Sequence, residues 1–196
     1  MDYAMLSRLQ IQSMTDQEDY LKLPMILVGA SAAVLPEQLA IWSYPLADAD
    51  ADQASFNMVT SMMCRIHQSG HLDSLTPESS AQVLEGIRIY KESLRKHIPS
   101  AVPFYPLGTS DVTDFTAPVA LGMRSSQQTL LAVWRIDGPA IIKIPFASRE
   151  ATLIYPVDLG VKATIADGAL NIEFTRKRMA CLVRMQDLIG NGTKRS

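Results

Sequence analysis

The chain has 196 residues, 47% of them hydrophobic, so it can fill a globular core but is too short for a complete (β/α)8 barrel of about 250 residues. Its 18 basic and 20 acidic residues give a net charge of −2, and we expect no nucleic-acid partner. The two basic runs, residues 176–178 and 194–195, are interpreted as a turn and a solvated tail. The most apolar stretch, residues 23–35, is shorter than the roughly 20 residues of a bilayer span, so no membrane partner is expected either.

The first half of the sequence alternates strand-like and helical segments. Residues 8–12 and 39–44 predict two short strands, and residues 20–28 predict a helix between them. Another helix is predicted over residues 52–66, because apolar residues recur there at spacings of three and four. These residues are Phe56, Val59, Met62, Met63 and Ile66. The alternation favours βα units around a parallel sheet.

The clearest helix start in the sequence lies at Thr76. Thr76 is predicted to be the N-cap, with Pro77 at the first helical position and Glu78 near the positive end of the helix dipole. Pro99 is expected to end this helix. Its predicted buried face consists of Val83, Leu84, Ile87, Tyr90, Leu94 and Ile98. Residues 67–73, which precede it, leave room only for a strand or a turn.

Beyond Pro99 the apolar residues follow a period of two, which is typical of strands. Residues 129–136 predict a strong strand, and a turn at Asp137-Gly138 predicts a hairpin with residues 140–146. Further strands are predicted at residues 151–155, at residues 170–175 after a turn at Asp167-Gly168, and at residues 179–185. Many short strands with frequent turns indicate an antiparallel sandwich.

The two halves together predict an α/β fold followed by an all-β fold. We expect residues 1–98 to form the α/β part, residues 99–188 to form an antiparallel β-sandwich domain, and residues 189–196 to form a flexible tail. The sequence does not fix the compartment, because no signal-peptide pattern is visible at its start.

Several polar residues lack the partners that a metal or disulfide site needs. Cys64 and Cys181 are too few for a disulfide framework and have no histidines at zinc-site spacing, so we expect two buried thiols. His67, His71 and Asp73 resemble a ligand set: in a strand-like segment His67 and His71 would share a face, and Asp73 would join them only by register. We expect packed side chains there and no metal.

One acidic cluster follows directly on the first predicted strand. Residues 13–20 carry Asp16, Glu18 and Asp19 behind the segment 8–12. Carboxylates at the carboxyl end of a parallel strand occupy the place where barrel enzymes hold their catalytic groups. Asp16 could equally serve as the N-cap of the next helix, and the pattern alone leaves both readings open.

A resemblance to a known family bears on this choice. Residues 6–20 resemble the segment around barrel strand six in the α-galactosidases of glycoside hydrolase family 36. The resemblance continues, in order, through residues 36–45, 56–59, 65–73, 103–108 and 133–135 and Tyr155-Pro156. It implies a (β/α)8 barrel, of which this chain holds the last βα units, followed by a C-terminal antiparallel β domain. It also implies a glycoside hydrolase without cofactor or metal, acting on an α-galactoside or oligosaccharide.

The resemblance assigns a role to Asp16. Asp16 matches the family's general acid/base, and Thr15 stands where the family often has serine. A retaining glycosidase holds its two carboxyl groups about 5 to 5.5 Å apart, and its acid works best with a pKa raised towards neutrality. Asp19 and Arg8 are predicted to shape the field around Asp16, with Asp19 also a candidate for substrate contact. Trp42 either stacks on a sugar face or packs in the core.

The sequence departs from the family at the nucleophile. The family's nucleophile is an aspartate in a Lys-x-Asp-x-Asn segment, and neither this nor its Cys-x-Ser-Gly-Gly segment occurs here. We therefore expect an α-galactosidase fragment with Met1 an internal methionine, inactive alone, that forms an oligomer or binds a missing N-terminal part of the barrel. The alternative is a non-catalytic module for packing, oligomerisation or carbohydrate binding.

Overall fold

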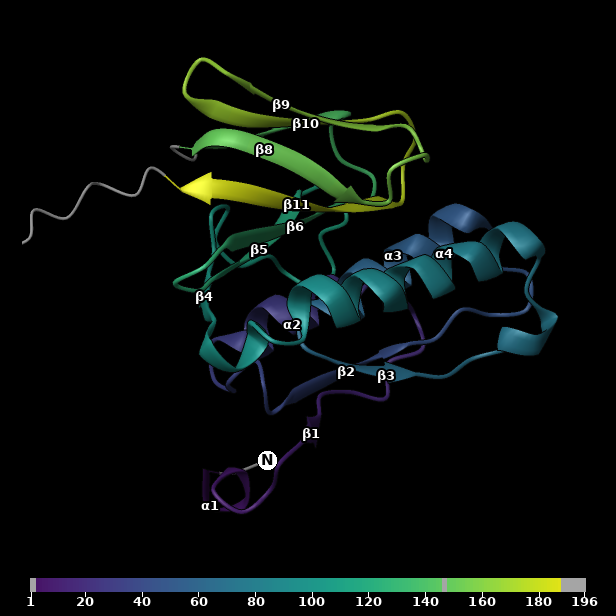
Figure 1. The fold of residues 1–196 in the computed structure, drawn as a ribbon. Coiled ribbons are helices and arrows are strands. Elements are labelled where there is room, and N and C mark those ends of the chain that lie inside the picture. The colour runs from purple at the N-terminus through teal and green to yellow at the C-terminus, as the bar shows by residue number, and fades with distance from the viewer. Residues whose placement is uncertain (1–2, 146–147, 188–196) are drawn as a thin grey trace, which may run out of the picture.

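Four layers stack in the computed structural model, which describes residues 3–145 and 148–187 (Figure 1). A small parallel sheet lies at the bottom of the view, helices cover its upper face, and two antiparallel sheets lie above the helices. The predicted tail, residues 189–196, lies outside the described residues. Among those described, no helix is both long and apolar enough to cross a bilayer.

The parallel sheet has the order β1-β2-β3 and is formed by successive βα units. Its strands are β1 (Gln12–Ser13), β2 (Leu39–Ser43) and β3 (Arg65–Gln68). The helices of this half are α1 (Tyr3–Leu6), α2 (Leu23–Ser31), α3 (Ala51–Met62) and α4 (Pro77–Ile89), and a π-helical turn (Tyr90–Leu94) prolongs α4. Two short 3-10 turns, Leu72–Ser74 and Ile98–Ser100, lie on either side of α4. The predicted parallel sheet is thus confirmed.

Several predicted boundaries in this half are wrong. The helix predicted over residues 20–28 is α2, Leu23–Ser31, and the helix predicted to end at Pro99 stops with the π-helical turn at Leu94. The strand predicted over residues 8–12 pairs only at Gln12–Ser13, which lies beside Leu39 and Ala40 of β2. The helix predicted over residues 52–66 ends at Met62, and Ile66 belongs to β3, where it pairs with Ile41. The turn between α3 and β3 is so short that Ile66 falls on the helical spacing by chance.

The helix start at Thr76 is confirmed, but its buried face is partly different. The Ser79 N–H donates to Thr76 Oγ1 at 3.2 Å, which is the expected N-cap bond. Leu84, predicted to be buried, is 67% exposed, whereas Gly86 and Ile89 are buried instead. Gly86 faces α3, and a Cβ there would lie 2.9 Å from Met58 Cε. Because α4 packs closely on α3 at this glycine, the buried face of α4 is centred on Gly86, and Leu84 lies outside it.

The second half forms two antiparallel sheets. The larger has the order β4-β5-β6-β11-β8 and the smaller has the order β7-β10-β9. The strands are β4 (Val102–Phe104), β5 (Val119–Arg124), β6 (Thr129–Arg135), β7 (Ile141–Pro145), β8 (Ser148–Tyr155), β9 (Val161–Ala166), β10 (Ala169–Phe174) and β11 (Met179–Asp187). The turn predicted at Asp167-Gly168 is confirmed and joins β9 to β10 as a hairpin, in which both turn residues have a positive φ, 52° and 70°.

The hairpin predicted at Asp137-Gly138 is wrong. β6 pairs with β5 and β11, whereas β7 pairs with β10 in the smaller sheet, so the chain crosses between sheets at this turn. Every residue of β6 is buried, and its two edges are hydrogen-bonded to β5 and β11, which leaves no edge for β7. Asp137-Gly138 signals a tight turn, but the turn residues carry no information about which sheet the next strand joins.

Two apolar cores hold the layers together. The first lies between the helices and the five-stranded sheet, and the second lies between the two antiparallel sheets. β11 serves both: Ala180 and Leu182 face the first core, and Cys181 and Val183 face the second. A buried hydrogen bond of 3.0 Å from Trp134 Nε1 to Thr60 Oγ1 joins β6 to α3. The α/β half and the large sheet therefore share one core.

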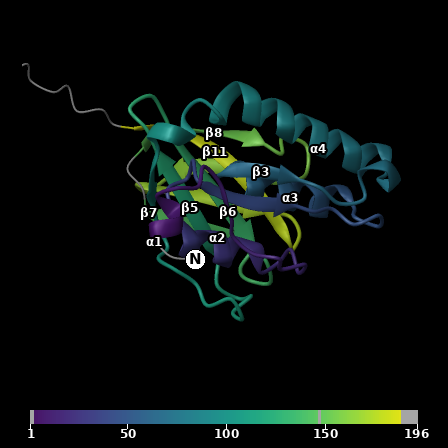
Figure 2. The same cartoon turned by 90° about the horizontal axis from the view of Figure 1, so that it is seen from below.

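The lower face of the parallel sheet has no helix over it among the described residues (Figure 2). The register pairs Ser13 with Ala40 and Trp42 with His67, and strand alternation places these four side chains on that face. Parallel sheets are normally covered on both faces. The loops that follow the three strands lie at one edge of this open face.

Candidate functional site

The loops after β1, β2 and β3 meet at one edge of the parallel sheet, because parallel strands end on the same side. They surround a hollow of about 200 Å³. Its lining residues are Asp16, Gln17 and Glu18 from the first loop, Trp42 from the end of β2, Tyr44 from the second loop and Ser69 from the third. The structure thus brings together two residues predicted from the sequence, Asp16 and Trp42.

The loop that carries Asp16 is held by bonds between its own residues. The Gln17 N–H donates to Thr15 Oγ1 at 3.0 Å, and the Asp19 N–H donates to Gln17 Oε1 at 2.9 Å. The Leu21 N–H then donates to Asp19 Oδ1 at 3.1 Å. Asp16 lies exposed in the middle of this series and does not cap α2, whose N-cap is Lys22. Its carboxylate is therefore available to a ligand in the hollow.

Asp19 and Arg8, the other two charged residues singled out in the sequence, lie elsewhere. The Asp19 carboxylate points to the start of α2, where Oδ2 lies 3.7 Å from Lys22 Nζ. Arg8 lies on the exposed turn after α1. The lining of the hollow includes neither residue. A contact of Asp19 with substrate stays a prediction.

Two ring pairs form the aromatic side of the site. The ring of Trp42 lies 5.0 Å from that of His67 at an angle of 57°, and Tyr44 lies 6.4 Å from His71 in an edge-to-face arrangement. Burial lowers the pKa of His67, so this imidazole is neutral near pH 7. A neutral His67 packs against Trp42 without placing a charge beside the indole ring.

The third loop reaches the hollow through a close backbone approach. Gly70 has a φ of +89°, and a Cβ there would lie 2.4 Å from the carbonyl oxygen of Pro45. The Ser69 N–H donates to Ser43 O and the His71 N–H donates to Pro45 O, both at 3.0 Å. Glycine at position 70 thus lets Ser69 and His71 lie on either side of the Tyr44-Pro45 segment.

Neither a metal site nor a disulfide is formed by the candidates named above. The described residues include no group of three or more His, Cys, Asp or Glu side chains that could hold a metal ion. His67 and His71 each contact an aromatic ring instead. Cys64 and Cys181 are free, buried thiols, as predicted.

Four lining residues were not singled out from the sequence: Gln17, Glu18, Tyr44 and Ser69. Glu18 and Gln17 lie in the acidic cluster, and Tyr44 lies two residues after Trp42. A signal for all four was available, because each follows one of the strands within a few residues. Only the three-dimensional arrangement shows which of the loop residues face the hollow.

No protein-family model matches the sequence, and neither does any curated protein. Solved structures of similar fold are glycoside hydrolases. A family 36 α-galactosidase from Geobacillus stearothermophilus, in complex with raffinose, superposes with a TM-score of 0.65 at 12% identity, over 88% of this chain and 25% of its own. The α-galactosidase from Lactobacillus brevis gives a TM-score of 0.60 at 13% identity, over 90% of this chain and 26% of its own.

The chain has the fold of one part of these α-galactosidases. It spans about a quarter of their length. The resemblance read from the sequence is therefore confirmed at the level of the fold. A family 27 β-L-arabinopyranosidase from the same Geobacillus species also matches, with a TM-score of 0.52 at 10% identity, over 95% of this chain and 47% of its own. Since that enzyme's name specifies another sugar, the shared fold does not fix the substrate.

Proposed function

We propose that this chain supplies the acid/base side of a retaining α-galactosidase site, with Asp16 as the general acid/base and Trp42 as a surface for the sugar ring. One observation carries the proposal: the exposed carboxylate of Asp16 and the indole of Trp42 line one hollow at the carboxyl edge of a parallel sheet. That edge is where barrel enzymes hold their catalytic groups.

The proposed chemistry is a double displacement at the anomeric carbon. A nucleophilic carboxylate attacks that carbon while Asp16 gives its proton to the leaving oxygen, and the glycosidic bond breaks. Asp16 then takes a proton from water, whose oxygen attacks the anomeric carbon and releases the nucleophile. Glu18 lines the same hollow but stands on the same loop as Asp16, whereas the two carboxyl groups of such enzymes flank the bond. The nucleophile in this proposal comes from residues outside this chain.

The parallel sheet is proposed to be the last three strands of a (β/α)8 barrel, within residues 1–98, followed by an antiparallel domain over residues 99–188. The open lower face supports this reading. Ser13 Oγ and His67 Nδ1 are buried on that face and have no hydrogen-bond partner among the described residues. Buried polar atoms are normally paired, so further chain is expected to supply their missing hydrogen-bond partners.

Turnover is the first test. We expect the chain alone to release no aryl group from an aryl α-galactoside above the buffer rate, since the nucleophile is absent. Clear turnover that is lost in Asp16→Asn would contradict the proposed division of the site and would place both carboxylates within this chain.

Ligand binding is the second test and needs no turnover. Nuclear magnetic resonance of the isotope-labelled chain, titrated with raffinose, is expected to move the indole N–H of Trp42 and the amides of residues 16–18. Trp42→Ala should abolish these shifts, whereas the matched substitution Trp134→Phe in the core should not. If an equal concentration of a glucoside gives the same shifts, galactoside recognition by this half-site is ruled out.

The alternative function is a non-catalytic module, and the open sheet face is the observation in its favour. For a packing or oligomerisation role, this alternative predicts association through that face and no ligand shifts at Trp42. A carbohydrate-binding module would give the same shifts, so the titration separates only the packing and oligomerisation roles from the proposed site.

A further inference from the structure

We propose that the turn between β10 and β11, residues 175–178, positions the loop that carries Asp16. Arg176 of this turn binds Asp52 in the first turn of α3, and Tyr20 of the loop packs on Phe56 of the same helix. The importance of this loop for catalysis rests on the proposed function of Asp16, but the positioning itself does not.

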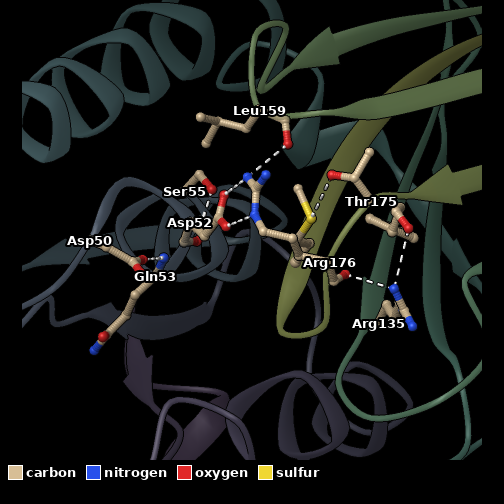
Figure 3. Close-up of polar contacts among 10 residues, drawn as sticks. Asp50, Asp52, Gln53, Ser55, Arg135, Leu159, Thr175 and Arg176 are labelled. Carbon is tan, nitrogen blue, oxygen red and sulfur yellow. Dashed lines mark hydrogen bonds and ion pairs between the residues drawn. The ribbon is translucent and has the colours of Figure 1, made fainter.

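The first contact is a two-pronged ion pair (Figure 3). Arg176 Nε donates to Asp52 Oδ2 at 2.6 Å, and Arg176 Nη2 donates to Asp52 Oδ1 at 2.8 Å. Nη2 also donates to the carbonyl oxygen of Leu159 at 3.2 Å. The Asp52 carboxylate raises the pKa of Arg176 in turn. Paired guanidinium–carboxylate bonds fix orientation as well as distance.

Asp52 lies in the first turn of α3, so this ion pair reaches the loop between β2 and α3. Asp50, the N-cap of α3, accepts a 2.8 Å bond from the Gln53 N–H, and Ser55 Oγ donates to the Asp52 carbonyl at 2.9 Å. Hydrogen bonds among residues 50–55 therefore fix the first turn of α3. The ion pair joins this turn to the antiparallel part of the molecule.

The second contact reaches the Asp16 loop itself. The ring of Tyr20 packs edge-to-face on Phe56 of α3, with centroids 5.3 Å apart. Burial raises the pKa of Tyr20, while the guanidinium of Arg178 beside its hydroxyl acts in the opposite direction. Arg178 has a φ of 58°, and its N–H donates to the Ile136 carbonyl at 3.0 Å. Tyr20 is thus held against α3, the helix whose first turn Arg176 binds.

The far end of the turn is anchored in the sheets by Arg135. This side chain is 9% exposed, and its Nε donates to the Gly138 carbonyl at 3.0 Å. Its Nη1 donates to the carbonyls of Phe174, at 3.2 Å, and Arg176, at 2.8 Å. These bonds join the segment after β6, which crosses to the smaller sheet, to the turn before β11. The chain of contacts therefore runs from a buried strand to the loop that holds Asp16.

The test measures hydrogen exchange of the loop amides in the full chain. Arg176→Gln and Arg178→Gln, singly and together, should speed exchange at Gln17, Asp19 and Leu21 by about two- to fivefold, the range expected for partly exposed charge contacts. Exchange in β6 and β11 should stay unchanged. Arg88→Gln is the matched control, because it removes two exposed ion pairs, to Glu85 in α4 and to Glu92 in the π-helical turn. Arg176→Lys should restore the protection only in part, since lysine cannot make the paired bonds.

A phenol titration gives an independent readout. Arg178→Gln should raise the pKa of Tyr20 further, because burial then acts without the opposing charge. If the arginine variants fail to fold, Tyr20→Phe replaces them as the test: it removes only the hydroxyl and should also speed exchange of the loop amides. Unchanged loop exchange in all variants, or an equal increase over the whole chain, would overturn the positioning role. A failed ligand titration at Trp42 would instead refute only the proposed function.

Discussion

Cys64 and Cys181 lie in different cores, and both side chains have no exposed surface. Burial raises the pKa of Cys64 to about 12 and raises that of Cys181 as well, so neither thiol ionises near neutral pH. We expect neither to react with a thiol reagent at pH 8 until the chain is unfolded, after which both should react. Counting modified thiols by mass spectrometry checks this, and rapid labelling of the native chain would contradict it.

His67 makes the stability of the fold depend on pH. Its pKa is lowered by burial, so below about pH 6.5 the unfolded chain takes up a proton at this residue before the folded chain does. The free energy of unfolding should therefore be highest above that pH and fall as the pH drops through the lowered pKa of the folded state. Urea unfolding at pH 7 and pH 5 measures the loss.

His67→Asn should show a smaller loss between these two pH values. His97, whose pKa is also lowered by burial, remains in this variant and keeps part of the dependence. His71→Asn is the control, because His71 is exposed. The linkage to His67 is wrong if the wild type and His67→Asn lose equal stability.

At the scale of elements, two helical glycines separate packing from helix propensity. Gly86 of α4 faces α3, where a Cβ would lie 2.9 to 3.1 Å from three atoms of Met58, whereas a Cβ at Gly29 of α2 would have nothing within 4 Å. Gly29→Ala should therefore stabilise the chain by up to about 1 kcal/mol through helix propensity. Gly86→Ala should destabilise it by about 1 to 3 kcal/mol, because the two helices must move apart. Chemical denaturation measures both, and a stabilising Gly86→Ala would contradict the close approach.

The same glycine explains why the α4 periodicity was only partly informative. Spacing placed Val83 and Leu94 correctly on the buried face, since both are nearly inaccessible to solvent. It could not show that the face is centred on Gly86, because glycine carries no hydropathy signal. Likewise the turn at Asp137-Gly138 was visible, but the sheet that β7 joins depends on the long-range partner β10.

For the whole molecule, the parallel sheet presents two strand edges without a neighbour in the described structure, at β1 and β3. Open edges and uncovered faces favour association. We expect the chain to self-associate with rising concentration, and Ile11→Lys, at an exposed position next to β1, to weaken this several-fold. Val157→Lys, an exposed residue just after β8, is the matched control. Sedimentation velocity checks both, and a monomer at every concentration would contradict the expectation.

The candidate site was predictable only in part. The acidic cluster after the first strand and the tryptophan near the end of the second mark Asp16 and Trp42, because βα order alone puts such residues at one edge. The basic run 176–178 was read as a plain turn. Its position beside α3 arises from pairings of β10 and β11 with strands far away in the chain, which no local pattern contains.

The sequence by itself determined the length limit, the order of the elements and the resemblance, because local periodicity, capping and turn residues are short-range properties. A chain of 196 residues cannot close an eight-stranded barrel. Only the tertiary structure decided that the helices share one core with the large sheet, and that one face of the parallel sheet stays open among the described residues. Those features depend on contacts between distant segments, and side-chain packing rather than spacing selects them.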